Sequence, residues 1–300
     1  MLAIIIPYFK LTFFEETLQS LANQTDKRFK VYIGDDASPE NPLELLERCK
    51  GKLDFVYHRF GENLGGTSLT QQWERCIEIT ADEEWLMILG DDDVLGENVV
   101  EEFFKQYNTF ENKTNIVRFA TVSHDYKKSQ TSKVFTHPNW EMAADSYFRR
   151  LIELTRSSLS EYVFKRSIYA EYKFYNYPLG WHSDDWAWLE FSNGKPIFTI
   201  NKSIVSIGFS EISLSGMDNN NELKNEASLK FYSNIFKKKL SLFSKEQSLE
   251  LLMRYEILIK KNRSLTVEEW KLLMHKYSLN FKLVPFMKLI RRVLFFIVKK

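Results

Sequence analysis

Short apolar runs alternate with amphipathic segments along the first 95 residues. The apolar runs predict four strands, at residues 2–6, 30–34, 53–57 and 85–89. Apolar residues at helical spacing predict the intervening helices, at 12–23, from about 42, and at 67–80. Capping sequences begin two of these helices, Thr12 with Glu15 and Asn41 with Pro42. Strands and helices that alternate through short loops are typical of a parallel sheet with right-handed crossovers.

Beyond residue 95 the alternation is lost. Strands are predicted at 115–122, 161–164, 196–200 and 203–207, and helices at 99–107, 142–155 and from Asp184 onward. From about Asn219 the pattern is helical, with capping boxes that begin at Ser244 and Thr266. We place a boundary in the polar run 218–221. The sequence therefore predicts a domain over 1–217, with halves 1–95 and 96–217, and a helical extension over 218–300.

Composition restricts the class of protein. A hydrophobic share of 44% in 300 residues can fill a sizeable core, so the chain is expected to be globular. Lysine and arginine number 41 against 40 acidic residues, so the overall charge gives no support to nucleic-acid binding. Cys49 and Cys76 lack metal-ligand spacing and are expected to be reduced thiols of a cytoplasmic protein. The apolar start has no basic residues before it and is short, which favours a first strand over a signal peptide.

Carboxylates follow two of the predicted strands. Asp91, Asp92 and Asp93 come after the strand at 85–89, and Asp35 and Asp36 after the strand at 30–34. The carboxyl ends of strands are where open α/β sheets bind ligands. Three adjacent like charges repel one another, and a divalent cation that bridges to a phosphate would relieve that repulsion. An acidic turn that caps the next helix is the alternative.

Five segments, taken in order, resemble the family-2 glycosyltransferases. They are Ile4-Ile5-Ile6-Pro7-Tyr8, Asp35-Asp36-Ala37-Ser38, Asn63-Leu64-Gly65-Gly66, Asp91-Asp92-Asp93 and Asp184-Asp185. The resemblance covers roughly residues 1 to 215. It implies the GT-A fold, an α/β nucleotide-diphospho-sugar transferase fold with a mostly parallel central sheet flanked by helices. The helical extension lies outside the resemblance.

The resemblance implies a metal site in the acidic cluster. Hard oxygen ligands suit Mg²⁺ or Mn²⁺, which would stabilise the leaving diphosphate. The usual family pattern is Asp-x-Asp-Asp, and Gly90 stands at its first position here. Asp92 is then the aligned metal ligand, but the three aspartates also read as Asp-x-Asp with Asp93 last. We expect Asp92 and Asp93 to hold the metal, with Asp91 and Asp92 near the sugar nucleotide.

The nucleotide half of the resemblance implies a UDP-sugar donor. Asp35 and Asp36 stand where a carboxylate can accept the uracil imide N–H, although a turn with a helix cap would also use them. Pro7 and Tyr8 end the first strand beside that pocket, and Tyr8 packs either on the base or in the core. Asn63 and Gly65 belong to a loop that brings backbone N–H groups to a phosphate or forms only a tight turn.

Two places where relatives carry basic residues lack them here. The segment Leu69-Thr70-Gln71-Gln72 supplies no basic residue to the diphosphate. After the last sheet strand only Ser213 and Ser215 are left as diphosphate contacts.

The segment Gly180 to Asp185 resembles the family's acceptor-site motif. By that match Asp185 is the general base that deprotonates the attacking hydroxyl, and Asp184 and Trp181 bind the acceptor. Aspartates that favour a helix N-terminus are the alternative reading of the pair. Trp181, Trp186 and Trp188 form either a platform for a sugar ring or part of the core. His182 is expected to be a hydrogen-bonding neighbour.

The tail at 281–300 combines apolar and basic residues without any acid. Leu283, Met287, Ile290 and Leu294 recur at helical spacing, and Lys288, Arg291 and Arg292 group on the other side, in a segment too broken by charge to span a bilayer. This pattern fits a helix at an anionic membrane surface. A helix docked on the protein or in a dimer contact is the alternative.

The sequence therefore predicts a metal-dependent, inverting glycosyltransferase that moves a sugar from a UDP-sugar to a saccharide or lipid-linked acceptor. We expect it to act in bacterial surface polysaccharide or lipopolysaccharide synthesis, in the cytoplasm or at the cytoplasmic face of the inner membrane, with a homo-oligomer left open. A sugar nucleotidyltransferase is a weaker alternative, because the first strand is followed by no glycine-rich basic loop. A non-catalytic saccharide-binding or scaffold protein gains some support from Gly90. A dinucleotide dehydrogenase is disfavoured by the absence of Gly-x-Gly-x-x-Gly.

Overall fold

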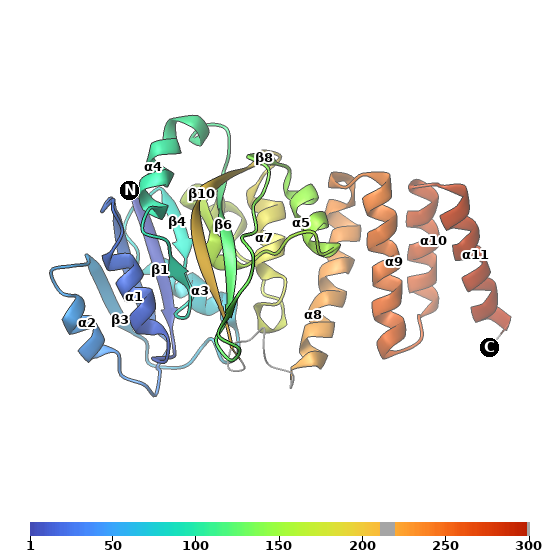
Figure 1. Ribbon diagram of the computed structural model, residues 1–300. Coiled ribbons are helices and arrows are strands. Elements are labelled where there is room, and N and C mark those ends of the chain that lie inside the picture. Colours follow the sequence, from blue (N-terminus) through green and yellow to red (C-terminus); the bar gives the residue numbers. More distant parts are fainter. Residues whose placement is uncertain (211–219, 299–300) are drawn as a thin grey trace. The chain divides into compact units, whose positions relative to one another are not determined.

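The computed structural model of the chain describes residues 1–210 and 220–298 (Figure 1). The chain divides into two units, Met1–Asn220 and Asn221–Lys300. The predicted boundary between residues 217 and 218 lies outside the described residues, as do Ser213 and Ser215.

A single mixed sheet organises the first unit. Its strands lie in the order β3-β2-β1-β4-β9-β6-β10-β5. Their bounds are β1 (Leu2–Tyr8), β2 (Phe29–Asp35), β3 (Phe55–Arg59), β4 (Trp85–Ile88), β5 (Val94–Leu95), β6 (Ile116–Asp125), β9 (Tyr162–Lys165) and β10 (Ile197–Phe209). Two short strands, β7 (Gln130–Thr131) and β8 (Trp140–Glu141), pair with β6 and β10. The strands β3, β2, β1 and β4 are mutually parallel, whereas β9 is antiparallel to both of its neighbours.

Helices cover this sheet and bury its first strand. They are α1 (Phe14–Ala22), α2 (Leu43–Cys49), α3 (Leu69–Glu78), α4 (Val99–Phe110), α5 (Ala143–Leu151), α6 (Arg166–Tyr172) and α7 (Ser183–Phe191). The apolar residues 2–6 of β1 are at most 1% exposed, as expected for a central strand with both faces covered. The predicted fold class, a central sheet flanked by helices and followed by a helical extension, is confirmed.

Several predicted boundaries are wrong in detail. Thr12 begins no capping box, because α1 starts at Phe14 and Phe13 occupies the N-cap. The third helix begins later than Thr67, with Ser68 as the N-cap that accepts a hydrogen bond from the Gln71 N–H. The strands expected at 196–200 and 203–207 form one strand, β10, whose pairing with β6 shifts between Ile200 and Ile204. An irregularity of this kind interrupts the apolar pattern without ending the strand.

The second unit is helical among its described residues. It comprises α8 (Asn221–Asn234), a π-helical turn (Ile235–Lys239), α9 (Lys245–Asn262), α10 (Val267–Leu279) and α11 (Leu283–Val298). The capping boxes at Ser244 and Thr266 are confirmed at the starts of α9 and α10. No helix in the described part of the chain has the length and apolar character needed to cross a membrane.

The two faces predicted for the tail helix are partly wrong. Arg292 turns inward and pairs with Glu256 of α9, and Leu289 is fully buried. Leu283, Met287 and Leu294 are instead more than half exposed, on the same helix as the exposed Lys288 and Arg291. Apolar and basic side chains therefore share the solvent side of α11.

Candidate active site

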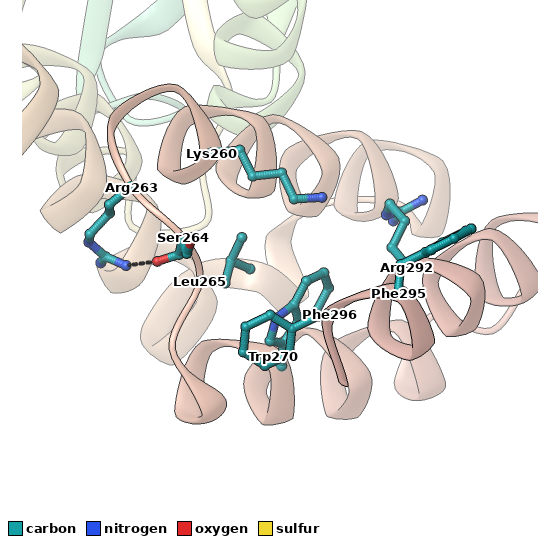
Figure 2. A pocket seen from close by; sticks show the side chains of 8 residues that line it. All are labelled: Lys260, Arg263, Ser264, Leu265, Trp270, Arg292, Phe295 and Phe296. Atoms are coloured by element: carbon teal, nitrogen blue, oxygen red, sulfur yellow. Dashed lines mark hydrogen bonds between the residues drawn. The ribbon is translucent and has the colours of Figure 1, made fainter. Parts of the chain in front are cut away.

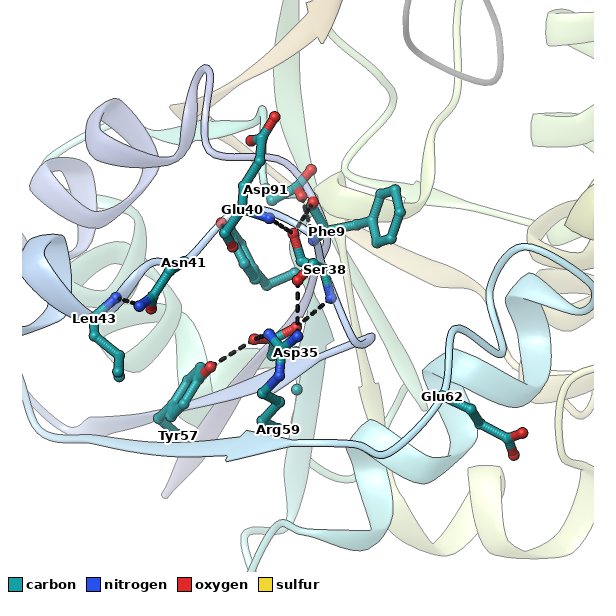
Figure 3. Close-up of polar contacts among 12 residues, drawn as sticks. Phe9, Asp35, Ser38, Glu40, Asn41, Leu43, Tyr57, Arg59, Glu62 and Asp91 are labelled. Atoms are coloured by element: carbon teal, nitrogen blue, oxygen red, sulfur yellow. Dashed lines mark hydrogen bonds and ion pairs between the residues drawn. The ribbon is translucent and has the colours of Figure 1, made fainter.

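The carboxyl ends of β1, β2 and β4 lie at the same edge of the sheet, and aspartates follow two of them (Figure 3). Asp91, just beyond β4, accepts hydrogen bonds from the backbone N–H groups of Phe9 and Lys10, each at 2.8 Å. These bonds tie the end of β4 to the loop after β1. The Asp91 carboxylate is thus engaged by the protein itself.

Asp92 is the carboxylate of the cluster without such support. Among the described residues no other residue donates a hydrogen bond to its side chain. Burial, together with the charges of Asp93 and Asp91, raises the pKa of Asp92 to about 8. An ionised Asp92 is therefore unfavourable in the protein alone and would be stabilised by a bound cation.

Asp93 is buried and held at both oxygens. Its Oδ1 accepts a hydrogen bond from the Gly208 N–H at 2.8 Å, and its Oδ2 accepts one from the Ser160 hydroxyl. Burial raises the pKa of Asp93, while these two bonds oppose the rise. Asp93 joins the end of β4 to β10 and to the turn before β9.

These contacts decide how a metal would fit. The described residues contain no group of three His, Cys, Asp or Glu side chains arranged to hold an ion. Protein donors engage Oδ2 of Asp91 and both oxygens of Asp93, whereas no other described residue donates to the Asp92 side chain. Asp92 is therefore the carboxylate of the cluster best placed to bind a cation. A hard divalent ion that takes most of its oxygens from water and a diphosphate suits a single carboxylate. The donor set fits Mg²⁺ or Mn²⁺ bound in that way.

Packing explains the glycine at the first position of the cluster. A Cβ on Gly90 would lie 2.7 Å from Oδ2 of Asp93 and 3.0 Å from Oδ1 of Asp92. The Gly90 N–H also donates a hydrogen bond to Ser160 Oγ at 3.0 Å. An aspartate at position 90 would displace Asp93 from its two donors, so Gly90 belongs to this arrangement of the cluster.

We expect Gly208→Ala to lower the melting temperature by several degrees. The added Cβ would lie 2.3 Å from the main-chain oxygen of Asp92, and overpacking of this kind costs about 1–3 kcal/mol. Thermal unfolding measures the effect. Gly61→Ala is the matched control, because a Cβ there meets no atom within 4 Å. Equal melting temperatures for the two variants would contradict the close packing of β10 against Asp92.

Asp35 and Asp36 are held by protein donors at the end of β2. Asp35 is fully buried and accepts hydrogen bonds from Tyr57 Oη (2.5 Å), Arg59 Nη1 (2.6 Å) and the Ser38 N–H (2.8 Å) (Figure 3). Asp36 accepts hydrogen bonds from the backbone N–H groups of Leu64 (2.7 Å) and Gly65 (2.9 Å). Both carboxylates thus organise the loops around the expected nucleotide pocket.

Arg75 is a residue that the sequence analysis missed. Its guanidinium pairs with Asp36 and lies 3.9 Å from the centre of the Phe60 ring. It stands one turn after Gln71 in α3, so a search one turn further along the predicted helix would have found a basic residue there. Arg75 and Asp36 together hold the Asn63 to Gly66 loop, in which Asn63 Oδ1 accepts a hydrogen bond from the Gly66 N–H at 2.7 Å.

Tyr8 was expected either on the base or in the core, and it lies in the core. Its ring is fully buried with its centre 4.6 Å from that of Phe14, and its hydroxyl donates to the Glu40 carbonyl at 2.9 Å. Pro7 precedes it in β1 and pairs with Gly34 of β2. Both residues lie in the sheet beside the expected nucleotide pocket.

Asp185 lies in the first turn of α7 and is 3% exposed. Its Oδ2 accepts a hydrogen bond from Arg150 Nη1 at 2.6 Å and lies 2.7 Å from His182 Nδ1. Burial alone would raise the pKa of Asp185, but Arg150 and His182 hold it below its ordinary value. No sequence signal distinguished Arg150, which stands near the end of α5.

Asp184 differs from its neighbour. Burial and the charge of Asp185 raise the pKa of Asp184 to about 7. Neither aspartate is the helix cap, because His182 occupies the N-cap of α7 with φ of 68°. Trp186 and Trp188 are buried core residues, and the partly exposed Trp181 packs edge-on against the His182 ring.

The segment before α7 lies against α3, the helix that follows the Asn63 to Gly66 loop. Ser68 and Thr70 at the start of α3 donate hydrogen bonds to Asn176 Oδ1, at 3.1 and 2.8 Å. Gly180 has φ of +66°, and a Cβ there would meet Leu69 and Trp73 of α3. These contacts bring the acceptor motif next to the loop that Asp36 and Arg75 hold.

Comparisons with known proteins concern the family and the fold. The family model described as Glycosyl transferase family 2 matches residues 3–172, a range that ends before Asp184. No curated protein matches the sequence. Among solved structures the chain is similar to TarS 1-349 of S. aureus in complex with UDP-GlcNAc, with a TM-score of 0.66 and 12% identity over 93% of this chain and 80% of that one.

The same S. aureus protein in complex with UDP gives a similar result. Its TM-score is 0.63 and its identity 14%, over 96% of this chain and 80% of that one. At such identities the likeness concerns the fold, and it supports the GT-A fold expected from the sequence.

Proposed function

The chain belongs to glycosyl transferase family 2, and we propose that this glycosyltransferase uses a UDP-sugar as donor and a divalent metal as cofactor. One observation carries the proposal: at the edge of the sheet where the strands end, Asp92 has a raised pKa and receives no hydrogen bond from another residue of the described part of the chain. The TarS structures with UDP and UDP-GlcNAc share this fold and support the choice of donor.

On the donor side, catalysis would depend on electrostatic stabilisation of the leaving diphosphate. Mg²⁺ or Mn²⁺ at Asp92 would supply positive charge to the leaving diphosphate. Asp91 and Asp93 hold the chain on either side of Asp92 through Phe9, Lys10 and Gly208. Asp36 and Arg75 keep the Asn63 to Gly66 loop in place beside the nucleotide. Asn63, Gly65, Pro7 and Tyr8 would shape the pocket without contributing charge.

The acceptor side would work through Asp185. We propose that this carboxylate takes the proton of the attacking hydroxyl, since Arg150 and His182 keep it ionised and oriented. A single base with no enzyme nucleophile inverts the anomeric centre by direct displacement. Asp184 and Trp181 would bind the acceptor, for which we propose a saccharide or a lipid-linked saccharide of a bacterial surface polysaccharide.

A UDP-release assay tests the function. The purified chain is incubated with UDP-GlcNAc, UDP-glucose or UDP-galactose, with Mn²⁺, Mg²⁺ or EDTA, and with candidate saccharide acceptors. We expect acceptor-dependent UDP release from one donor that EDTA abolishes. Release that persists in EDTA would contradict the metal, and tight UDP binding without release from any donor would favour a saccharide-binding scaffold.

The exposed face of α11 leads us to propose a peripheral contact with the cytoplasmic face of the inner membrane. Val284, Met287 and Leu294 are 62%, 56% and 56% exposed, with Lys288 and Arg291 exposed on the same helix. Apolar side chains would enter the interface and basic ones would meet anionic headgroups. A homo-oligomer that covers this face is the competing proposal.

We expect the triple variant Val284→Gln, Met287→Gln, Leu294→Gln to bind anionic vesicles at least about ten-fold more weakly than the natural chain, because each exposed apolar side chain loses its burial in lipid. Co-sedimentation with phosphatidylglycerol vesicles measures it. The control is the triple variant Leu223→Gln, Leu242→Gln, Met253→Gln, which changes three exposed apolar side chains (44%, 45% and 41%) of the same unit outside α11. Equal binding by both triples would exclude α11 as the contact, and a dimer dissociated by the first triple would favour the oligomer.

A further inference from the structure

A cavity of about 310 Å³ lies within the second unit, between α9, α10 and α11 (Figure 2). Three cationic side chains and three aromatic rings line it: Lys260, Arg263, Arg292, Trp270, Phe295 and Phe296. The cationic groups remain partly accessible, with side-chain exposures of 43%, 47% and 31% for Lys260, Arg263 and Arg292. The cavity therefore offers positive charge within apolar walls.

Among the residues that the structure describes, the ion pairs of this cavity leave one positive charge unmatched. Glu256, which is 3% exposed, accepts from Lys260 Nζ at 2.5 Å and from Arg292 at 2.7 and 2.9 Å. Arg263 has its own partner in Glu269, at 2.8 and 2.6 Å. Two cations that share one carboxylate are balanced by a bound monoanion, such as a phosphodiester.

The aromatic walls favour an anion attached to an apolar body. Trp270 is buried, with Lys260 Nζ 5.3 Å from its ring centre and the Phe296 ring 5.7 Å away. Phe295 lines the cavity and is also 57% exposed on α11. The cavity thus opens beside the exposed apolar side chains of α11, where hydrocarbon chains would lie.

The two units of the chain differ in net charge, and the second unit, which contains the cavity, is the basic one. Residues 221–300 contain 18 lysines and arginines against 7 acidic residues, whereas residues 1–220 contain 23 against 33. The near neutrality of the whole chain hides this division. A strongly basic unit with an exposed apolar helix is attracted to an anionic lipid surface.

We infer that the cavity formed by Lys260, Arg263, Arg292 and Trp270 binds the phosphodiester headgroup of an anionic lipid, with the lipid chains along the exposed face of α11. This inference rests on the proposed membrane contact and adds a defined headgroup site to it. Lys260 and Arg292 hold the phosphate oxygens, and Phe295 separates the headgroup from the chains.

Binding of water-soluble short-chain lipids tests the site. The full chain is titrated calorimetrically with dihexanoyl phosphatidylglycerol below its micelle concentration, with dihexanoyl phosphatidylcholine and with inorganic phosphate. Lys260→Gln removes the unmatched charge and leaves Arg292 paired with Glu256, so this variant is expected to fold. Lys261→Gln is the matched control, because Lys261 is exposed and does not line the cavity.

We expect saturable binding of the phosphatidylglycerol that Lys260→Gln weakens about five-fold or more and Lys261→Gln leaves within about two-fold. Equal weakening by both variants, or equal binding of the phosphatidylcholine, would overturn the headgroup site. If inorganic phosphate bound as tightly as the phosphatidylglycerol, the proposal that the bound phosphate belongs to a lipid would be overturned. Vesicle co-sedimentation in parallel separates the two proposals: vesicle binding without short-chain lipid binding keeps the membrane contact and overturns the site.

Discussion

Replacing Asp92 by asparagine is expected to abolish sugar transfer and to raise the melting temperature of the protein at about pH 8. Activity is lost because the neutral amide cannot hold the divalent cation that stabilises the leaving diphosphate, a contribution of several kcal/mol to the barrier. Removal of such a contribution lowers kcat by about 10³-fold or more. Sugar transfer from the UDP-sugar is measured with saturating Mn²⁺.

The gain in stability follows from the raised pKa of Asp92. Burial and the charges of Asp93 and Asp91 raise it to about 8 in the folded protein, whereas an unfolded chain keeps it near its ordinary value of about 3.9. At a pH between these two pKa values, Asp92 in the folded state must either bind a proton or bear an uncompensated negative charge. The cost to stability therefore increases as the pH rises from about 4 to 8, and asparagine removes it.

Thermal unfolding at two pH values checks this second half of the prediction. Without metal we expect Asp92→Asn to melt about 2–4 °C above the natural protein at about pH 8, and to lose that advantage near about pH 4. Mn²⁺ should raise the melting temperature of the natural protein and not of the variant. The exposed Asp82→Asn serves as a control of equal charge. A variant that melts lower at pH 8, or that responds to Mn²⁺, would contradict the assignment of Asp92.

Asp185→Asn is expected to lower kcat by about 10²–10⁴-fold, the usual contribution of a general base. The binding of UDP with Mn²⁺ should change little, because Asp92 and the β1 and β2 loops are untouched. The variant leaves Arg150 without its carboxylate partner and is therefore expected to be less stable. A UDP titration at low temperature verifies that the folded form is the one assayed. Full turnover by Asp185→Asn would remove this residue from the base role.

The pH dependence of kcat distinguishes Asp185 from Asp184. Arg150 and His182 hold the pKa of Asp185 below its ordinary value, so this base stays ionised, and kcat should be level as the pH falls from about 8 to 6. The pKa of Asp184 is raised to about 7. If Asp184 were the base, kcat would fall about ten-fold for each pH unit below 7. The profile is measured at saturating metal, and a fall of that kind that disappears in Asp184→Asn would transfer the role to Asp184.

Local patterns were sufficient to predict the sheet and the main candidate residues. Apolar runs identified β1, β2 and β4, because a strand buried on both faces needs a nearly unbroken apolar stretch. The half-exposed edge strand β3 was found too, but two residues early. The carboxylates after β2 and β4 followed from where those runs end. Capping boxes at Ser244 and Thr266 were correctly read because every group in them lies within four residues. At Thr12 the same pattern failed, because the path of the chain after β1 places Phe13 at the helix start.

The sequence by itself determined the family, the strand ends and the acidic residues that lie there, since each depends on neighbours along the chain. Tertiary structure alone decided how the three aspartates differ. Asp91 meets Phe9 and Lys10, and Asp93 meets Gly208 and Ser160. These partners are 67 or more positions away in all four pairs and 115 in the most distant. Asp92 receives no hydrogen bond from another residue within 1–210 and 220–298. Hydrogen-bond donors from remote segments carry no local periodicity, so only the folded chain could assign a separate environment to each carboxylate.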